Sequence, residues 1–172
     1  MTLRLAHPED VPALVTIGRS TFADAFGHLY SDEDLAAFLD DWRSPERIAA
    51  NVADPDVRVA IVEDAGAVVA YCMTLFGKGF SERPAPQLAK PAYLSQLYCT
   101  PAVTGRGVGG LLMDDCLAEA RRRACDAVQL SVWSENFGAQ RFYARYGFEK
   151  VADIDFWVGN QRDDEFLYEL RL

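Results

Sequence analysis

The chain has 172 residues, of which 50% are apolar and 25% are charged, and its formal net charge is −9. This size and composition predict one soluble globular domain over residues 1–172 and exclude a disordered chain. The acidic excess argues against nucleic acid as a partner, and the apolar runs are too short to span a bilayer, so we expect neither nucleic-acid nor membrane binding.

The first residues and the cysteines are typical of a cytoplasmic protein. Met1–Asp10 lacks the basic stretch and the apolar stretch of a signal peptide. The four cysteines have no C-x-x-C spacing and the two histidines are isolated, so we expect no metal site. Scattered cysteines in a reducing compartment are most simply small core residues.

In chain order, the first part of the sequence reads as a strand followed by three helices. Thr2–Ala6 alternates like a short strand, and the apolar spacing predicts a helix over residues 7–26, with Asp10 as a possible cap. Ser31–Trp42 and Ser44–Asp54 predict two further helices, because serine and early carboxylates suit a helix N-terminus.

From residue 57 the pattern changes to strands, with helices between the later ones. Turns are predicted at Ala65-Gly66 and Gly159-Asn160, and residues 77–91, rich in glycine and proline, form a loop. The predicted strands are Val57–Asp64, Ala67–Phe76, Ala92–Thr100, Ala127–Trp133 and two within Lys150–Leu172, and the predicted helices span 108–124 and 136–146. This order predicts an α/β (α+β) fold with one mixed sheet and helices on both faces.

The glycines of "TPAVTGRGVGG" spell G-x-G-x-x-G at Gly105, Gly107 and Gly110. The dinucleotide-binding pattern requires the strand to run directly into the first glycine, but Pro101 interrupts it, although Glu135 does follow the next strand. A P-loop is excluded, because no G-K-[ST] follows. What remains is a run of amides that turns into a helix N-terminus, which binds a diphosphate, or a glycine-rich helix start that binds nothing.

The same stretch resembles the acetyl-CoA loop of the GNAT acetyltransferase superfamily, L-Y-[V]-x-P-x-x-[QR]-G-x-G-[IV]-G. The matching residues are Leu97, Tyr98, Pro101, Gly105, Gly107, Val108 and Gly109. Cys99 stands where valine is commoner. Thr104 replaces the usual Gln or Arg, a change expected to remove one side-chain contact to the diphosphate, and we expect Arg106 to supply some positive charge there.

A second motif supports the resemblance. "NFGAQRFYARYGF", from Asn136 to Phe148, is similar to the family's N-x-x-A-x-x-F-Y-x-x-x-G-F at every fixed position. Taken alone, its aromatic residues also fit an amphipathic helix that packs on a core and ends at Gly147. The two motifs occur in the family's order and separation, joined by a helix and a strand.

The resemblance implies a GNAT-type single domain with a mostly antiparallel sheet of about seven strands. It implies an acetyl-CoA-binding core over residues 92–148 and N-terminal helices over residues 8–54 that shape the acceptor site. Acetyl-CoA is the implied co-substrate, and a homodimer stays open. The residues implied to bind acetyl-CoA are Leu97, Tyr98, Cys99, Thr104, Gly105, Arg106, Gly107, Val108, Gly109, Gly110, Asn136, Ala139 and Tyr143.

The implied chemistry is direct attack of an amine on the thioester. The backbone N–H of Cys99 would hold the oxyanion, and Tyr143 would protonate the departing thiolate. Packing alone is the alternative role for Tyr143, and a nucleophilic Cys99 lacks a nearby histidine. The general base stays unassigned, because the strand where many relatives carry a glutamate has Tyr93, Ser95 and Gln96.

The acceptor is a small amine on this interpretation. "STFADAFGHLYSDEDLAAFL" and the C-terminal segment resemble bacterial polyamine (spermidine/spermine) N-acetyltransferases, which makes a polyamine the first acceptor to try. Phe22, Phe26 and Tyr30 are candidates to wall the acceptor channel, or else they are core residues. The acids that could attract a polycation, or else cap helices, are Asp24, Asp32, Glu33 and Asp34. A protein lysine or N-terminal acetyltransferase and a non-catalytic acyl-CoA-binding module are the alternatives.

Overall fold

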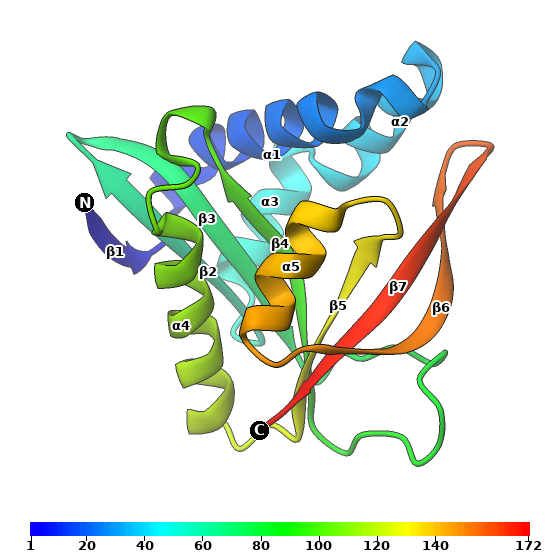
Figure 1. Ribbon diagram of the computed structural model, residues 1–172. Helices are drawn as coiled ribbons and strands as arrows, with labels where there is room; N and C mark the ends of the chain where they lie inside the picture. Colours follow the sequence, from blue (N-terminus) through cyan, green and yellow to red (C-terminus); the bar gives the residue numbers. More distant parts are fainter.

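The computed structural model describes all 172 residues as one seven-stranded sheet with five α-helices (Figure 1). The strands are β1 (Thr2–Leu5), β2 (Val57–Asp64), β3 (Ala67–Phe76), β4 (Pro91–Cys99), β5 (Ala127–Trp133), β6 (Glu149–Val158) and β7 (Gln161–Arg171). The helices are α1 (Val11–Phe26), α2 (Asp32–Trp42), α3 (Pro45–Ala53), α4 (Val108–Arg122) and α5 (Phe137–Arg145).

The helix starts follow from local side-chain chemistry. Ser31 and Ser44 accept hydrogen bonds from the backbone N–H groups of Asp34 and Arg47, so they cap α2 and α3 as predicted. The expectation that Asp10 caps α1 is wrong. Its carboxylate instead accepts the His7 N–H at 2.7 Å and pairs with Arg4, because a 3-10 turn over Pro8–Asp10 precedes the helix.

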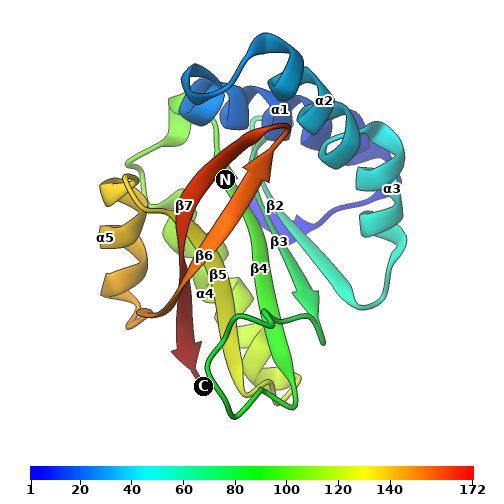
Figure 2. The same ribbon diagram turned by 90° about the vertical axis from the view of Figure 1, so that its right-hand side faces the viewer.

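The sheet has the order β1-β2-β3-β4-β5-β7-β6, and every neighbouring pair is antiparallel except β4 with β5. Helices α1 and α3 pack on one face over Ile61, Tyr71 and Met73. Helices α4 and α5 cover the other face, where Leu112 and Met113 are fully buried (Figures 1 and 2). The predicted mixed sheet with helices on both faces is therefore confirmed.

The parallel pair is short, and this opens the sheet in its middle. β4 and β5 are in register only over Pro91–Tyr93 and Ala127–Gln129. Beyond these residues the two strands diverge, so the residues from Leu94 to Cys99 have β3 as a neighbour on one edge and no strand on the other. A register shift between Met73 and Thr74 leaves Ser95 of β4 without a partner residue. No helix is long and apolar enough to cross a membrane.

Candidate active site

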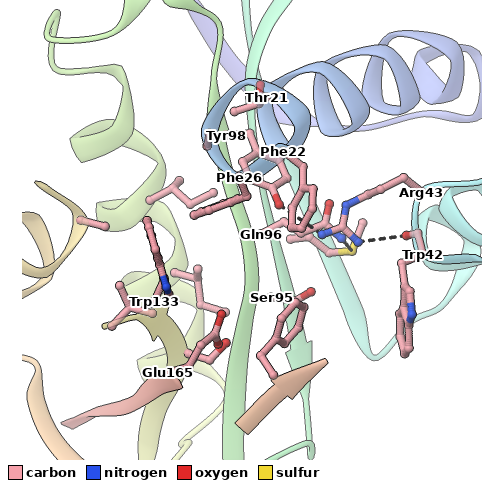
Figure 3. A pocket seen from close by; sticks show the side chains of 18 of the residues that line it. Thr21, Phe22, Phe26, Trp42, Arg43, Ser95, Gln96, Tyr98, Trp133 and Glu165 are labelled. Carbon is pink, nitrogen blue, oxygen red and sulfur yellow. Dashed lines mark hydrogen bonds between the residues drawn. The ribbon is translucent and has the colours of Figure 1, made fainter. Parts of the chain in front are cut away.

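A cavity of about 540 Å³ lies where β4 and β5 separate. Its walls come from α1 and α2, from the middle of β4, from the end of β5 with the start of α5, and from the β6–β7 hairpin. Figure 2 shows the tip of that hairpin close to α1 and α2, which encloses this end of the sheet. Figure 3 shows Phe22, Phe26 and Arg43 on one side of the cavity and Trp133 and Glu165 on another.

The glycine loop leads into the N-terminus of α4. Gly105 and Gly107 have φ values of +77° and +82°, a conformation that favours glycine, and neither has a neighbour where a Cβ would stand. No side chain caps α4 at Gly107, in contrast to α2 and α3. The first amides of α4, from Val108 to Gly110, therefore remain free to bind an anion at the positive end of the helix.

The other predicted residues of the loop have separate roles. The hydroxyl of Thr104 donates to the carbonyl of Thr100 at 3.1 Å, so it ties the loop to itself, and Arg106 is exposed. A Cβ at Gly109 would lie 3.8 Å from Phe142, and one at Gly110 would lie 3.2 Å from the Tyr146 hydroxyl. These two glycines let α4 pack closely against α5.

The open edge of β4 offers backbone donors to the cavity. The N–H of Thr100 donates to the carbonyl of Val69 in β3. Because N–H groups alternate between the two edges of a strand, those of Leu97 and Cys99 face the opening. The Cys99 thiol is half-buried, and burial raises its pKa, which is unfavourable for a nucleophile.

The start of α5 brings the second motif to the same cavity, which Asn136, Ala139 and Tyr143 all line. The Asn136 side chain caps α5 by accepting the Ala139 N–H at 3.1 Å. The Tyr143 ring packs on Phe148, and burial raises the pKa of its hydroxyl above the ordinary value, so the hydroxyl stays protonated at neutral pH.

Comparison with known proteins identifies the family. The model of the acetyltransferase (GNAT) family matches residues 19–148. The chain belongs to the acetyltransferase (GNAT) family. It is an acetyl-CoA-dependent N-acetyltransferase, as the two motifs predicted, and the free amides at the start of α4 fit the diphosphate of this co-substrate.

Relatives of this acetyltransferase cover nearly all of it. It is 27% identical over 164 residues to an uncharacterized N-acetyltransferase of Lactobacillus delbrueckii subsp. lactis, with 95% of this chain and 93% of that protein covered. It is 28% identical over 158 residues to one of Mycobacterium tuberculosis, with 92% and 95% covered.

Solved structures share the acetyltransferase fold. The PaiA N-acetyltransferase from Thermoplasma acidophilum in complex with coenzyme A has a TM-score of 0.78 at 18% identity, with 99% and 98% of the two chains covered. NAA60 from Arabidopsis thaliana in complex with a bisubstrate analogue has a TM-score of 0.76 at 17% identity, with the same shares covered. At these identities the likeness concerns the fold.

The aromatic residues predicted for the acceptor channel of the acetyltransferase all line the cavity. Phe22 is 5% exposed and stacks on Phe38 at 4.7 Å between ring centroids, so it also belongs to a local core. The Phe26 ring meets Trp133 edge-on at 6.0 Å, and the Tyr30 hydroxyl donates to Asp163. In contrast, the cavity lining includes none of the four predicted acids, Asp24, Asp32, Glu33 and Asp34.

Two carboxylates that the sequence reasoning missed line the cavity of the acetyltransferase. Asp163 and Glu165 lie two residues apart on β7, so both side chains are on the same face of the strand. The Oε2 atom of Glu165 is buried without a hydrogen-bond partner. Burial raises the pKa of Glu165 to about 7; the negative charge of Asp163 adds to this rise and a hydrogen bond from Ser131 opposes it.

The sequence reasoning also missed two arginines of the lining, Arg47, which is exposed, and Arg43, which is buried. Arg43 directly follows α2, where a basic residue is expected for the helix dipole alone.

The alternation of side chains along β7 was the one sequence signal that could have placed Asp163 and Glu165 in the cavity. This alternation did not show which face of β7 points to the interior, because Phe166 and Tyr168 on the opposite face are also partly buried. The described residues contain no cluster of three or more His, Cys, Asp or Glu side chains that could hold a metal ion.

Proposed function

We propose that this acetyltransferase transfers the acetyl group to a small primary amine bound in the cavity between β4 and β5. The observation that carries the proposal is one cavity of about 540 Å³ lined by Tyr143, by the diverging part of β4 and by two carboxylates. A cavity of this size suits a small acceptor better than a protein surface. We also propose that residues 8–54 shape the acceptor site and that residues 92–148 bind acetyl-CoA.

Bound acetyl-CoA supplies a thioester carbonyl for the amine to attack and a thiol as leaving group. The amides of α4 from Val108 to Gly110, together with Gly105 and Gly107, hold the diphosphate by the attraction of free N–H groups for an anion. Of the predicted contact residues, Leu97, Tyr98, Asn136 and Ala139 lie along the cavity. Thr104 and Arg106 lie in the exposed loop beside the glycines.

The backbone of β4 and the hydroxyl of Tyr143 act on the reacting atoms. The N–H of Cys99 faces the opening and is the proposed donor to the oxyanion, a role that needs a fixed amide and not a thiol. Tyr143 is the proposed general acid, because its hydroxyl remains protonated and lies in the cavity wall. The raised pKa of the Cys99 thiol favours this direct route over an acetyl-cysteine intermediate.

Glu165 is the proposed general base. An amine is protonated at neutral pH and must lose a proton before it attacks, and a base works best when its pKa is near the working pH. Glu165 lines the cavity, has a free oxygen and carries a pKa of about 7. Glu165 would thus take the role of the glutamate that many relatives carry on the strand corresponding to β4, because β7 reaches the cavity from the other side of the opening.

A polyamine is one candidate for the acceptor, on the strength of the sequence resemblance. Phe22, Phe26 and Tyr30 would contact its methylene groups, and Asp163 with Glu165 would attract its charge. Asp24 and the acids at the start of α2 lie outside the lining, so they would attract a polyamine only at long range and would not contact it in the cavity. Cytoplasmic location and a homodimer remain predictions.

The test is acetyl-CoA binding followed by turnover. Calorimetric titration with acetyl-CoA should give micromolar affinity, and NAD, the control for the literal G-x-G-x-x-G, should give no heat. Release of free CoA thiol is then measured with a panel of small amines. Binding of NAD without acetyl-CoA, or tight acetyl-CoA binding without transfer to any amine or peptide, would contradict the proposal, and the second result would favour a non-catalytic acyl-CoA-binding module.

A further inference from the structure

We infer that the acceptor carries an oxyanion group, such as a carboxylate or a phosphonate, in addition to its primary amine, and that Arg43 binds this group. The inference rests on the proposed function and narrows its acceptor from amines in general to amines with a negative group. It concerns a residue that the acetyl-transfer chemistry does not use.

Arg43 is buried without a counter-ion. Its side chain is in the cavity lining, and the residue is only 8% exposed. One terminal nitrogen donates to the carbonyl of Trp42 at 3.0 Å and the other to the hydroxyl of Tyr98 at 3.1 Å, while Nε has no partner (Figure 3). Both acceptors are neutral, and no carboxylate lies within 4.0 Å of the guanidinium.

The other arginines with partly buried side chains are neutralised. Arg58 pairs with Asp115 at 2.8 Å and Arg83 with Glu169 at 2.6 Å. An uncompensated buried charge is costly, so arginines are buried where an anion meets them. Arg58 and Arg83 each have a carboxylate partner, whereas Arg43, which is buried and lies in the cavity wall, has none.

The surroundings of Arg43 also fit a ligand. The guanidinium carbon lies 5.9 Å from the ring centroid of Phe22, 5.7 Å from that of Phe38 and 5.9 Å from that of Tyr98, so three aromatic rings hold the group in place. A guanidinium fixed in this way binds an oxyanion through its remaining N–H groups with little loss of side-chain freedom.

Figure 3 shows charged residues on different sides of the cavity, with Arg43 on one side and Glu165 on another. Arg43 and Arg47 come from the end of α2 and from α3, while Asp163 and Glu165 come from β7. An acceptor with an ammonium and an oxyanion complements both sides, whereas a polyamine would bring a second positive charge toward Arg43. The lining between them includes Phe22 and Phe26, which suits an apolar portion of the acceptor.

The test compares amines that differ only in the negative group. Initial rates of CoA release are measured with apolar α-amino acids, with ω-amino acids and with aminophosphonates, each beside the amine that lacks only the carboxylate or phosphonate; 1,5-diaminopentane and spermidine represent polyamines. We expect at least one oxyanion-bearing amine to exceed its truncated partner in kcat/KM by tenfold or more. The aminophosphonates show whether a carboxylate or a phosphorus oxyanion is preferred.

Substitution of Arg43 then assigns the effect to this side chain. Arg43→Met keeps the length of the side chain and removes its charge, and it should lower the preference for the oxyanion-bearing amine by about 10- to 100-fold through KM, the range of a charged hydrogen bond. Arg43→Lys should keep part of the preference. Arg19→Met is the matched control, because Arg19 pairs with Asp40 outside the cavity lining and should leave the preference unchanged.

The outcomes separate this inference from the proposed function. If truncated amines or polyamines are the better acceptors, or if the preference survives in Arg43→Met, Arg43 has only a structural role and the inference is overturned while acetyl transfer stands. Acetyl-CoA binding without transfer to any oxyanion-bearing amine also overturns it. A protein that fails to bind acetyl-CoA overturns the proposed function itself. Acetyl-CoA affinity of Arg43→Met equal to that of the natural protein excludes misfolding as the cause of a loss.

Discussion

Replacing Glu165 by glutamine tests the proposed base and its environment together. Glutamine has nearly the shape of a protonated glutamate but can neither accept the amine's proton nor carry charge. Loss of a general base lowers kcat by about 10²- to 10⁴-fold. In the natural protein a base with a pKa of about 7 is mostly protonated at pH 6 and mostly ionised at pH 8. The rate of CoA release should therefore rise about tenfold over this interval, beyond the change due to titration of the amine itself.

The same pKa predicts an effect on stability. The pKa of Glu165 is about 7 when folded and 4.5 as an ordinary side chain, so the unfolded state releases the proton more readily. The raised folded-state pKa gives Glu165 a contribution to stability that is fully present below pH 4.5 and is lost as the pH rises through 7. The full difference is about 3 kcal/mol. Glu165→Gln should remove this loss and melt at a higher temperature than the natural protein at pH 8, with similar melting at pH 4.5.

These two measurements have separate refutations. A variant that keeps its pH-dependent rate and loses less than tenfold in kcat shows that Glu165 is not the base. A variant without any gain in melting temperature at pH 8, measured by calorimetry beside the natural protein, shows that the carboxylate is ionised at little cost. Either result would refute the reasoning from burial at that step.

Three further substitutions test the other parts of the site. Tyr143→Phe should lower kcat by about 10²-fold or more and leave the acetyl-CoA Kd unchanged by calorimetry, because only proton donation is lost; unchanged turnover would remove the assignment as acid. Gly107→Ala should cost about 1–2 kcal/mol for a left-handed backbone and weaken acetyl-CoA binding, whereas Gly66→Ala, at φ +80° in the β2–β3 turn, should cost as much stability with no change in binding. Equal acetyl-CoA affinities in the two glycine variants would show that the loop does not need Gly107. Tyr30→Phe should lower stability by about 1–3 kcal/mol in thermal melts, because Asp163 loses its hydrogen-bond donor in a buried position; an unchanged melting temperature would show that this bond contributes nothing.

The elements of the fold could be predicted because their signals are local. Periodicity placed the β2, β3 and β5 boundaries as observed, since each strand is bounded by turn residues or a helix end. The capping roles of Ser31 and Ser44 needed only the next three residues. Asp10 was misjudged because its partner Arg4 lies on β1, and the competition between a cap and an ion pair is decided by tertiary contacts.

The residues proposed to bind the co-substrate lie in two continuous motifs, so the sequence alone can indicate them. The lining of the acceptor half could not be predicted in full, because it is assembled from parts far apart in the chain. Tyr30 and Asp163 are 133 residues apart, yet they share a hydrogen bond. The burial of Arg43 depends on how α2 packs on α1, which its place just after a helix end does not reveal. Likewise, the environment that raises the pKa of Glu165 exists only once β7 stands beside β5.

The separation of β4 and β5 leaves β4, a strand in the middle of the sheet, with one edge largely unpaired. Three residue pairs join the two halves of the sheet there, and the backbone groups of β4 beyond Tyr93 meet no strand on that side. Acetyl-CoA, which we propose binds in this opening, would stabilise the folded enzyme to an extent that depends on its concentration. At a concentration one hundred times its Kd, such a ligand adds about 2.7 kcal/mol to the stability of the folded chain. In a cell starved of acetyl-CoA and CoA this added stability would be absent, so the abundance of the acetyltransferase would follow the acetyl-CoA pool even with constant synthesis.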